Sequence, residues 1–340
     1  MHSLSRYFAT ATALLAAFPA ICRSQTFDAI GTRAAGMSGA FVAVADDASA
    51  AYWNPAGFAS GSFFSLALDR TSASTDAGEI RAGSRSGWLL ALGAPALGLS
   101  YYRLRGTVIE PATPTAEASP DRNLADASSL SVRTLVSHHA GATLVQSIAP
   151  GVAVGATLKL VRGIAAADVR AGEDRESLLD DGGALLGRGS SRFDADLGIM
   201  ATFGRVKGGL TVRNLTQPEF DTTIEGQALT LERQVRAGIA FVPVPGWTLA
   251  ADADLVRTTG ISGGEARDVA FGGEGRVARR IFVRAGTRFN TAGDGGAGRS
   301  ASVSAGASYA VTASVMVDGH VTSGAASAGR GWGIAARFVY

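Results

Sequence analysis

Two adjacent carboxylates, Asp46 and Asp47, are the residues near the N-terminus best suited to chemistry. Paired carboxylates act as general acid and base in hydrolases, and carboxylates also bind divalent cations. A simpler role is available, because residues 48–53 have the composition of a short helix and an aspartate at a helix start accepts hydrogen bonds from its first N–H groups. We therefore expect a helix cap. The helix must end at Asn54, since a residue before proline is disfavoured in the helical conformation.

Two further patterns resemble known sites but lack an essential feature. Gly31 and Gly36 have the spacing of glycines in a phosphate-binding loop, but Met37 stands where that loop needs a lysine. The neighbouring residues His138 and His139 lie in a predicted strand, where adjacent side chains point to opposite faces and cannot share a metal ion. We expect neither a cofactor nor a metal.

A lipid hydrolase is the remaining catalytic possibility. His320 lies on the polar face of a predicted strand, and Ser300 and Ser302 lie near the same end of the preceding one. No third polar partner can be placed beside them, as a catalytic triad requires. The favoured interpretation of His320 is a polar residue that faces an interior, and we expect no enzymatic activity.

Strands must position these residues, because the chain from Gly61 onward alternates between apolar and polar or small side chains. One face of the last segment carries Trp332, Ile334, Ala336, Phe338 and Tyr340. Alternation with period two indicates strands with one apolar face. Fourteen such segments lie near residues 61–70, 80–93, 96–106, 128–147, 151–163, 191–203, 208–216, 229–242, 247–257, 267–277, 280–290, 299–309, 312–322 and 330–340.

Three features favour a membrane barrel over a soluble sandwich. The segments run for about ten residues, the length of a tilted strand that crosses a bilayer. Short and long connections alternate along the chain, and the strand number is even, as in outer-membrane barrels. The third feature is the large number of charges on the polar faces, which suit a lumen and not lipid. As an independent check of the strands, no proline interrupts a proposed strand. The sequence therefore predicts an all-β fold, a 14-stranded antiparallel transmembrane barrel.

The polar faces of these strands carry charges that lipid could not accommodate, so they must line a lumen. The principal ones are Asp194, Asp196, Arg236, Asp252, Asp254, Glu274, Arg284 and Arg288. Both signs occur together, which favours paired networks because unpaired buried charges are costly. A hydrated pore in which each charge is solvated is an equally good interpretation.

The N-terminus has the pattern of an export signal. A basic start at residues 1–6 precedes an apolar stretch at 7–21, with small residues at cleavage spacing, so residues 1–24 are expected to be a signal peptide. A lipid anchor on Cys22 is the alternative, although Ile21 suits it poorly. Removal of residues 1–24 takes away Arg6 and Arg23 and leaves 29 basic and 29 acidic residues. This balance does not point to nucleic acid as a partner.

The block between the signal and the first strand resembles a known family. Residues 31–57 are similar to the N-terminal signature of FadL/TodX-type outer-membrane proteins, most nearly its PorV/PorQ-like branch. The matching positions are Gly31, Gly36, Gly39, Asp46, Asp47, Asn54, Pro55 and Gly57. Residues 209–215 also resemble a strand of that branch. The resemblance implies a short helical hatch, here residues 25–60, inside a barrel formed by residues 61–340.

The resemblance also implies a function. It suggests passive uptake of a small hydrophobic compound across the outer membrane of a Gram-negative bacterium, with a ligand pocket lined by Phe41, Tyr52, Trp53 and Phe58. Outer-membrane lipid, including lipopolysaccharide, and the barrel assembly machinery are the other expected partners; the terminal Tyr340 resembles an assembly signal. One alternative is a PorV-like scaffold for secreted proteins, with loops 107–127 and 164–190 as the contact surface. The rim lipid hydrolase is the third.

Overall fold

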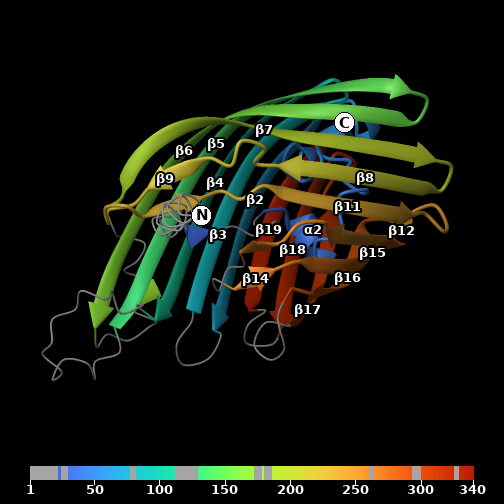
Figure 1. Cartoon of the computed structure of the whole chain (residues 1–340). Helices are drawn as coiled ribbons and strands as arrows, with labels where there is room; N and C mark the ends of the chain where they lie inside the picture. Colours follow the sequence, from blue (N-terminus) through green and yellow to red (C-terminus); the bar gives the residue numbers. More distant parts are fainter. Residues whose placement is uncertain are drawn as a thin grey trace, which may run out of the picture.

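Fourteen antiparallel strands form a closed barrel in the computed structural model, which describes residues 22–23, 30–76, 82–111, 129–171, 178–179, 186–259, 264–292, 300–324 and 329–340 (Figure 1). The strands of the barrel are β2 (Ser65–Asp76), β3 (Ala82–Ala94), β4 (Leu97–Pro111), β5 (Ser129–Ala149), β6 (Val152–Ala171), β7 (Arg188–Phe203), β8 (Val206–Arg213), β11 (Gln234–Phe241), β12 (Trp247–Asp254), β15 (Asp268–Ala278), β16 (Ile281–Asn290), β17 (Ala301–Ala310), β18 (Val315–Gly324) and β19 (Arg330–Val339).

The ring closes where the last strand pairs with the first. Strand β19 runs antiparallel to β2, from Val339 opposite Ser65 to Arg330 opposite Ser74. Each other strand pairs with its neighbours in the ring, so no wall strand has an open edge. The predicted 14-stranded barrel is confirmed, and each predicted segment corresponds to one wall strand.

Some predicted boundaries were wrong. The first strand begins at Ser65 rather than at residue 61, because the chain first leaves the hatch. The segment predicted from 229 joins the wall only at Gln234, since β10 (Ala228–Thr230) pairs with β9 (Glu219–Asp221) and with β1 (Cys22–Arg23) instead. A second small hairpin, β13 (Thr258–Thr259) with β14 (Glu265–Ala266), lies between β12 and β15.

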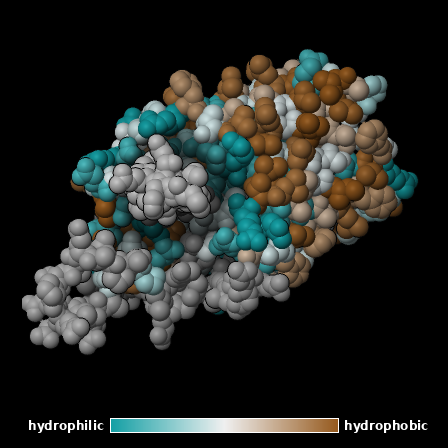
Figure 2. Space-filling model, viewed as in Figure 1, coloured by the Kyte–Doolittle hydropathy of each residue, from teal (hydrophilic) through white to brown (hydrophobic). Residues whose placement is uncertain are grey.

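The outer and inner faces of the wall have opposite character. On β6, Leu158 is 70 % exposed while the next residue, Lys159, is 1 % exposed. The same alternation recurs on other strands, where Leu144, Phe193 and Ile334 are exposed on the outer face. Figure 2 shows the result as a broad hydrophobic region over the half of the barrel that carries the short turns, with hydrophilic residues toward the long loops.

The interior is filled by the segment before the first wall strand, which contains α2 (Thr32–Gly36), α3 (Ala50–Trp53) and the 3-10 helix η1 (Pro55–Ser60). We call residues 30–60 the hatch. Its apolar side chains form the largest core cluster together with inward residues of the wall. No helix among the described residues is long and apolar enough to cross a membrane. The predicted signal peptide and residues 25–29 lie outside the described residues, apart from Cys22 and Arg23.

Candidate functional site: a hatch held by charges inside the barrel

The hatch begins with a turn that only glycine fits. Gly31 has φ of +105°, and a Cβ atom there would lie 2.6 Å from Nε1 of Trp53. The indole N–H instead donates to the Ile30 carbonyl oxygen at 3.0 Å. Gly31, whose spacing resembled that of a phosphate-binding loop, therefore has a structural role: it leaves room for Trp53 to bind the start of the hatch.

Asn54 ties the hatch to itself and to the wall. Its Oδ1 accepts a hydrogen bond from the Ala56 N–H, and its Nδ2 donates to the carbonyl oxygens of Val42, in the hatch, and Ile199, on β7. Helix α3 ends just before Asn54, whose backbone is extended as the following Pro55 requires. The residues of the Asn-Pro pair thus have a structural role at the hatch-wall contact.

The expected helix cap needs correction. Helix α3 begins at Ala50, with Ser49 as the capping residue, and its side chain makes no capping bond. Asp47 accepts hydrogen bonds from the Ser49 backbone and hydroxyl through Oδ1, which orders the turn before the helix. Asp46 takes no part in this turn and lies 2.5 Å from the Arg33 guanidinium. Ion pairing therefore determines the position of Asp46.

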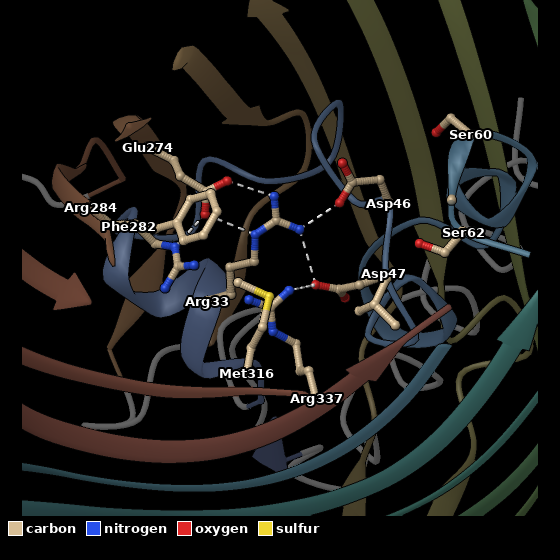
Figure 3. A pocket seen from close by; sticks show the side chains of 12 residues that line it. Arg33, Asp46, Asp47, Ser60, Ser62, Glu274, Phe282, Arg284, Met316 and Arg337 are labelled. Carbon is tan, nitrogen blue, oxygen red and sulfur yellow. Dashed lines mark hydrogen bonds and ion pairs between the residues drawn. The ribbon is translucent and has the colours of Figure 1, made fainter. Parts of the chain in front are cut away.

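The two aspartates belong to a larger set of charges that joins the hatch to strands β15, β16, β18 and β19 (Figure 3). We call this set the latch; it consists of Arg33, Asp46, Asp47, Glu274, Arg284, Asp318 and Arg337.

Ion pairs run through the latch from hatch to wall. Arg33 lies 3.0 Å from Asp47 and 2.7 Å from Glu274. Arg337 lies 3.0 Å from Asp47 and 2.6 Å from Asp318, and Arg284 pairs with both wall acids. Every charge except that of Asp46 is largely buried, so loss of one partner would leave another uncompensated.

A cavity of about 360 Å³ borders the latch. Its walls include latch residues together with Ser60, Ser62, Phe282, Met316 and Val339 (Figure 3). Phe282, Met316 and Val339 lie at the strand ends near the short turns. The latch therefore lies at the short-turn end of the hatch, and the cavity gives it access to solvent.

Two wall carboxylates hold the hatch by its backbone. Asp69 on β2 accepts hydrogen bonds from the N–H groups of Gly31 and Thr32, and Asp252 on β12 accepts from those of Phe41 and Val42 at 2.8 Å each. Carboxylates bind N–H groups strongly in such arrangements. Asp252 was among the predicted lumen charges, whereas Asp69 was missed. The sequence did contain a sign of this role, because Asp69 is an acid among the apolar residues of the first strand.

A second charged cluster lies entirely buried beside the hatch. Nζ of Lys159 lies 3.0 Å from Asp194 and 2.7 Å from Asp196. The guanidinium of Arg213 lies over the ring of Tyr52, 3.5 Å from its centroid, and 4.0 Å from Asp196. The predicted pair Asp194 and Asp196 thus joins the wall strands to an aromatic residue of the hatch.

The other predicted lumen charges also point inward. Arg236 pairs with Asp254 at 2.6 Å and donates to the Gly39 carbonyl oxygen at 3.4 Å, which links β11 and β12 to the hatch. Arg288 lies 3.7 Å from Asp268. These contacts favour paired networks over a pore of separately hydrated charges.

Glycines of the wall allow the hatch backbone to approach closely. A Cβ atom at Gly155 would lie 2.5 Å from Pro55 and Ala56, and one at Gly272 would lie 2.5 Å from the Met37 carbonyl oxygen. These close approaches of the hatch to wall glycines were not predicted from the sequence. Their signal was the glycine excess itself, located on inward positions of strands where glycine is otherwise unfavourable.

The four aromatic residues predicted to line a ligand pocket lie in the core of the hatch. Phe41, Tyr52, Trp53 and Phe58 are at most 2 % exposed. Trp53 makes edge-to-face contacts with Phe41 and Tyr52, with ring centroids 5.8 and 6.0 Å apart. The ring of Phe58 lies against Gly93 and Gly98 of the wall, and none of the four residues lines the latch cavity.

The residues considered for metal binding and hydrolysis remain apart. His139 is buried and stacks on Tyr102, while His138 faces outward. Ser302 pairs across β17 and β18 with Gly324, and His320 pairs with Gly306. Four residues along β17 separate the two positions, about 13 Å at the rise of a strand, so Ser302 and His320 form no catalytic pair.

The latch should respond to acid through Asp47. Burial alone would raise the pKa of its carboxyl, but the guanidinium groups of Arg337 and Arg33 and the Ser49 hydrogen bond lower the pKa from 3.8 to about 2. A lowered pKa stabilises the folded state above pH 4 and loses this contribution as the pH falls from about 4 to 2, a total of about 2 kcal/mol. We expect hatch contacts to weaken in this range, measured as ion current through single barrels. The Asp47→Asn variant should lose the part of this current change that comes from Asp47. If the variant and the unmodified chain show the same dependence of current on pH, Asp47 is not the responsible group.

Comparison with known proteins places the chain in a family. Residues 72–254, more than half of the chain, match the family described as F plasmid transfer operon, TraF, protein. The chain belongs to this family. Residues 31–57, with the matched signature, precede the part of the chain that this TraF family model covers. No curated protein matches the sequence.

Solved structures share the fold of this TraF family member at low sequence identity. The CymD monoaromatic hydrocarbon channel is 14 % identical, with a TM-score of 0.59 over 93 % of this chain and 99 % of that one. A Pseudomonas aeruginosa FadL homologue is 11 % identical, with a TM-score of 0.59 over 91 % and 98 %. The Pseudomonas putida toluene transporter TodX is 12 % identical, with a TM-score of 0.54 over 90 % and 96 %. The FadL-type fold predicted from residues 31–57 is confirmed.

Proposed function

We propose that the protein is an outer-membrane channel for the passive uptake of small hydrophobic compounds, closed by its N-terminal hatch. The latch and its cavity carry the proposal, because they hold the hatch by contacts that can separate without unfolding of the wall. Proteins of similar fold are named as a hydrocarbon channel and a toluene transporter. The division into signal peptide 1–24, hatch 25–60 and barrel 61–340 is part of this proposal, as is closeness to the PorV/PorQ-like branch.

The location follows from the surface of the barrel. A closed barrel satisfies every backbone hydrogen bond of its wall, as hydrocarbon requires. Its large exposed outer residues include many leucines, isoleucines, valines and phenylalanines. We place the short turns toward the periplasm and the long loops toward the outside, the arrangement common to outer-membrane barrels. The latch cavity then opens on the periplasmic side.

The route for a substrate passes between hatch and wall. In the described strand pairings the ladders are continuous except for two register shifts, between Ser147 and Ala149 and between Arg276 and Ala278. Both lie beside short turns, so neither provides an opening in the middle of the wall. Release of a substrate therefore requires the ion pairs of the latch to break and the hatch to move. Residues 112–127 of the first predicted contact loop, and residues 172–177 and 180–185 of the second, lie outside the described residues. The residues that are described there give no support to the scaffold alternative.

A reversible lock on the hatch tests the proposal. An added Cβ atom at Gly333, on β19, would lie 2.7 Å from Oγ1 of Thr32, so a cysteine pair at these positions can join α2 to β19. Cells that carry the oxidised Thr32→Cys/Gly333→Cys variant should take up radiolabelled toluene or oleate at the rate of cells without the barrel. Reduction of the disulfide should restore uptake.

Single-cysteine variants provide the matched control, because each carries the same steric change without the lock. Their uptake should be insensitive to oxidation. Equal uptake by the oxidised and reduced double variant would contradict a moving hatch, and absence of uptake by the unmodified barrel would contradict the proposed function.

A further inference from the structure

A row of side chains crosses the outer wall on five neighbouring strands, β2 to β6. Each member stands directly opposite the next in the strand pairing. We call it the outer row; strand by strand it consists of Arg70, Trp88, Arg103, His138 and Arg162. Directly opposite residues have Cβ atoms about 4.5–5.5 Å apart, so the row is a continuous strip.

The outer row points away from the lumen. The sequence neighbours Asp69, Tyr102, His139 and Val161 are buried on the inner face. Arg70 and Arg162, at the ends of the row, are exposed, while its central members are half-buried. Arg105, one outward position further along β4 from Arg103, adds another positive charge.

The row lies at the loop-side boundary of the apolar surface. On β2 the outward residues before Arg70 are Leu66 and Leu68, and on β6 those before Arg162 are Leu158 and Leu160. Two aromatic rings mark the same level: Trp88 lies 5.1 Å from Tyr101, and the Tyr101 hydroxyl hydrogen-bonds to Nδ1 of His138 at 2.8 Å. Aromatic residues with polar tips collect where membrane meets water.

The structure describes no acidic partner for the positive charges of the row. In the described part of the chain, no carboxylate lies within 4.0 Å of Arg70, Arg103, Arg105 or Arg162. Two acids further along these strands are already paired, Glu110 with Arg133 and Asp168 with Arg170. Arg103 and Arg105 lie two residues apart on the same face of β4, where like charges repel each other. An external anion would therefore stabilise this strip.

We propose that the outer row binds the phosphate groups of lipopolysaccharide in the outer leaflet. Arginine binds phosphate through two parallel hydrogen bonds, which suits it to this task more than lysine. Acyl chains of the same lipid would lie on the leucines below the row, and the sugar headgroup above it. The inference rests on the proposed location and orientation of the barrel, but it does not require uptake.

Lipid binding by the purified full chain tests the inference. Native mass spectrometry in detergent can titrate the barrel with lipid A that carries two phosphates, and with the dephosphorylated form. Arg103→Gln/Arg162→Gln should weaken binding of the phosphorylated form about 10- to 100-fold, as loss of two charged contacts predicts. The dephosphorylated form should bind weakly to both proteins.

A matched double variant at the other end of the barrel is the control. Arg279→Gln/Arg280→Gln changes two exposed arginines of a short turn, and it should bind phosphorylated lipid A as the unmodified chain does. Equal binding of both lipid forms, equal loss in both variants, or equally tight binding of phosphatidylglycerol would overturn the inference. Circular dichroism verifies that the variants are folded. Because no transport is measured, the result is independent of the uptake assay.

Discussion

Replacement of Lys159 by methionine is expected to destabilise the barrel by about 3 to 5 kcal/mol, the usual cost when one partner of a buried ion pair is removed. Methionine fills a similar volume, so the loss is one of charge. Asp194 and Asp196 would remain buried in the wall, with Arg213 at 4.0 Å from Asp196 as the nearest remaining cation. The free energy of unfolding in urea and detergent, followed by tryptophan fluorescence, measures the effect.

Two comparisons separate the charge effect from packing. Addition of Asp194→Asn and Asp196→Asn to the Lys159→Met variant should recover part of the stability, because the two buried carboxylates become neutral amides. Arg213 then keeps its contact with the Tyr52 ring but loses Asp196. Lys207→Met, in a half-buried lysine of β8 near a short turn, should cost less than about 1 kcal/mol. Equal destabilisation by the two lysine variants would show that the buried pairs are unimportant.

Substitution of two wall glycines is expected to expel the hatch while the wall stays closed. The side chain of a valine at Gly155 would overlap with the backbone of Pro55, and that of a valine at Gly272 with the backbone of Met37. Overpacking of this kind costs about 1–3 kcal/mol at each site, whereas valine itself suits a strand. Ion current through single barrels in a planar bilayer should rise toward that of a chain from which residues 30–60 are deleted.

Glycines on the outer face provide the control for this experiment. Gly208 and Gly319 are also strand residues, and a Cβ atom at either would meet no other atom within 4 Å. The Gly208→Val/Gly319→Val variant should keep the low current of the unmodified barrel. If the Gly155→Val/Gly272→Val variant is folded and gives the same low current, the position of the hatch does not depend on these two glycines.

The wall could be predicted from sequence because its physical cause is repetitive. Hydrocarbon outside and a polar interior impose one alternation on every strand, so Leu158 and Lys159 already indicate their sides of the wall. Strand ends were harder, since β10 has strand composition but pairs with β9 and not with the wall. Alternation alone does not reveal which neighbour a strand selects.

The contacts between hatch and wall could be predicted only in part. The Asn-Pro pair and the inward charges could be recognised in the sequence. Their partners could not, because they lie far away along the chain, as Glu274 does from Arg33. Asp46 and Asp47 looked like a local cap, and the ion pairs to Arg33 and Arg337 determined the outcome. The four hatch aromatics had the composition of a ligand pocket, and only the packing reveals that they fill the core.

The hatch bridges the place where the two ends of the wall meet. Asp69 on β2 and Arg337 on β19 lie on the first and last wall strands, and both bind the hatch. The pairing of these two strands joins residues more than 250 positions apart, so closing the ring has a large entropic cost. A segment that precedes β2 in synthesis is thus already positioned to receive the final strand. Because it binds both end strands, we expect the hatch to favour closure of the ring, while the wall itself closes through the pairing of β19 with β2.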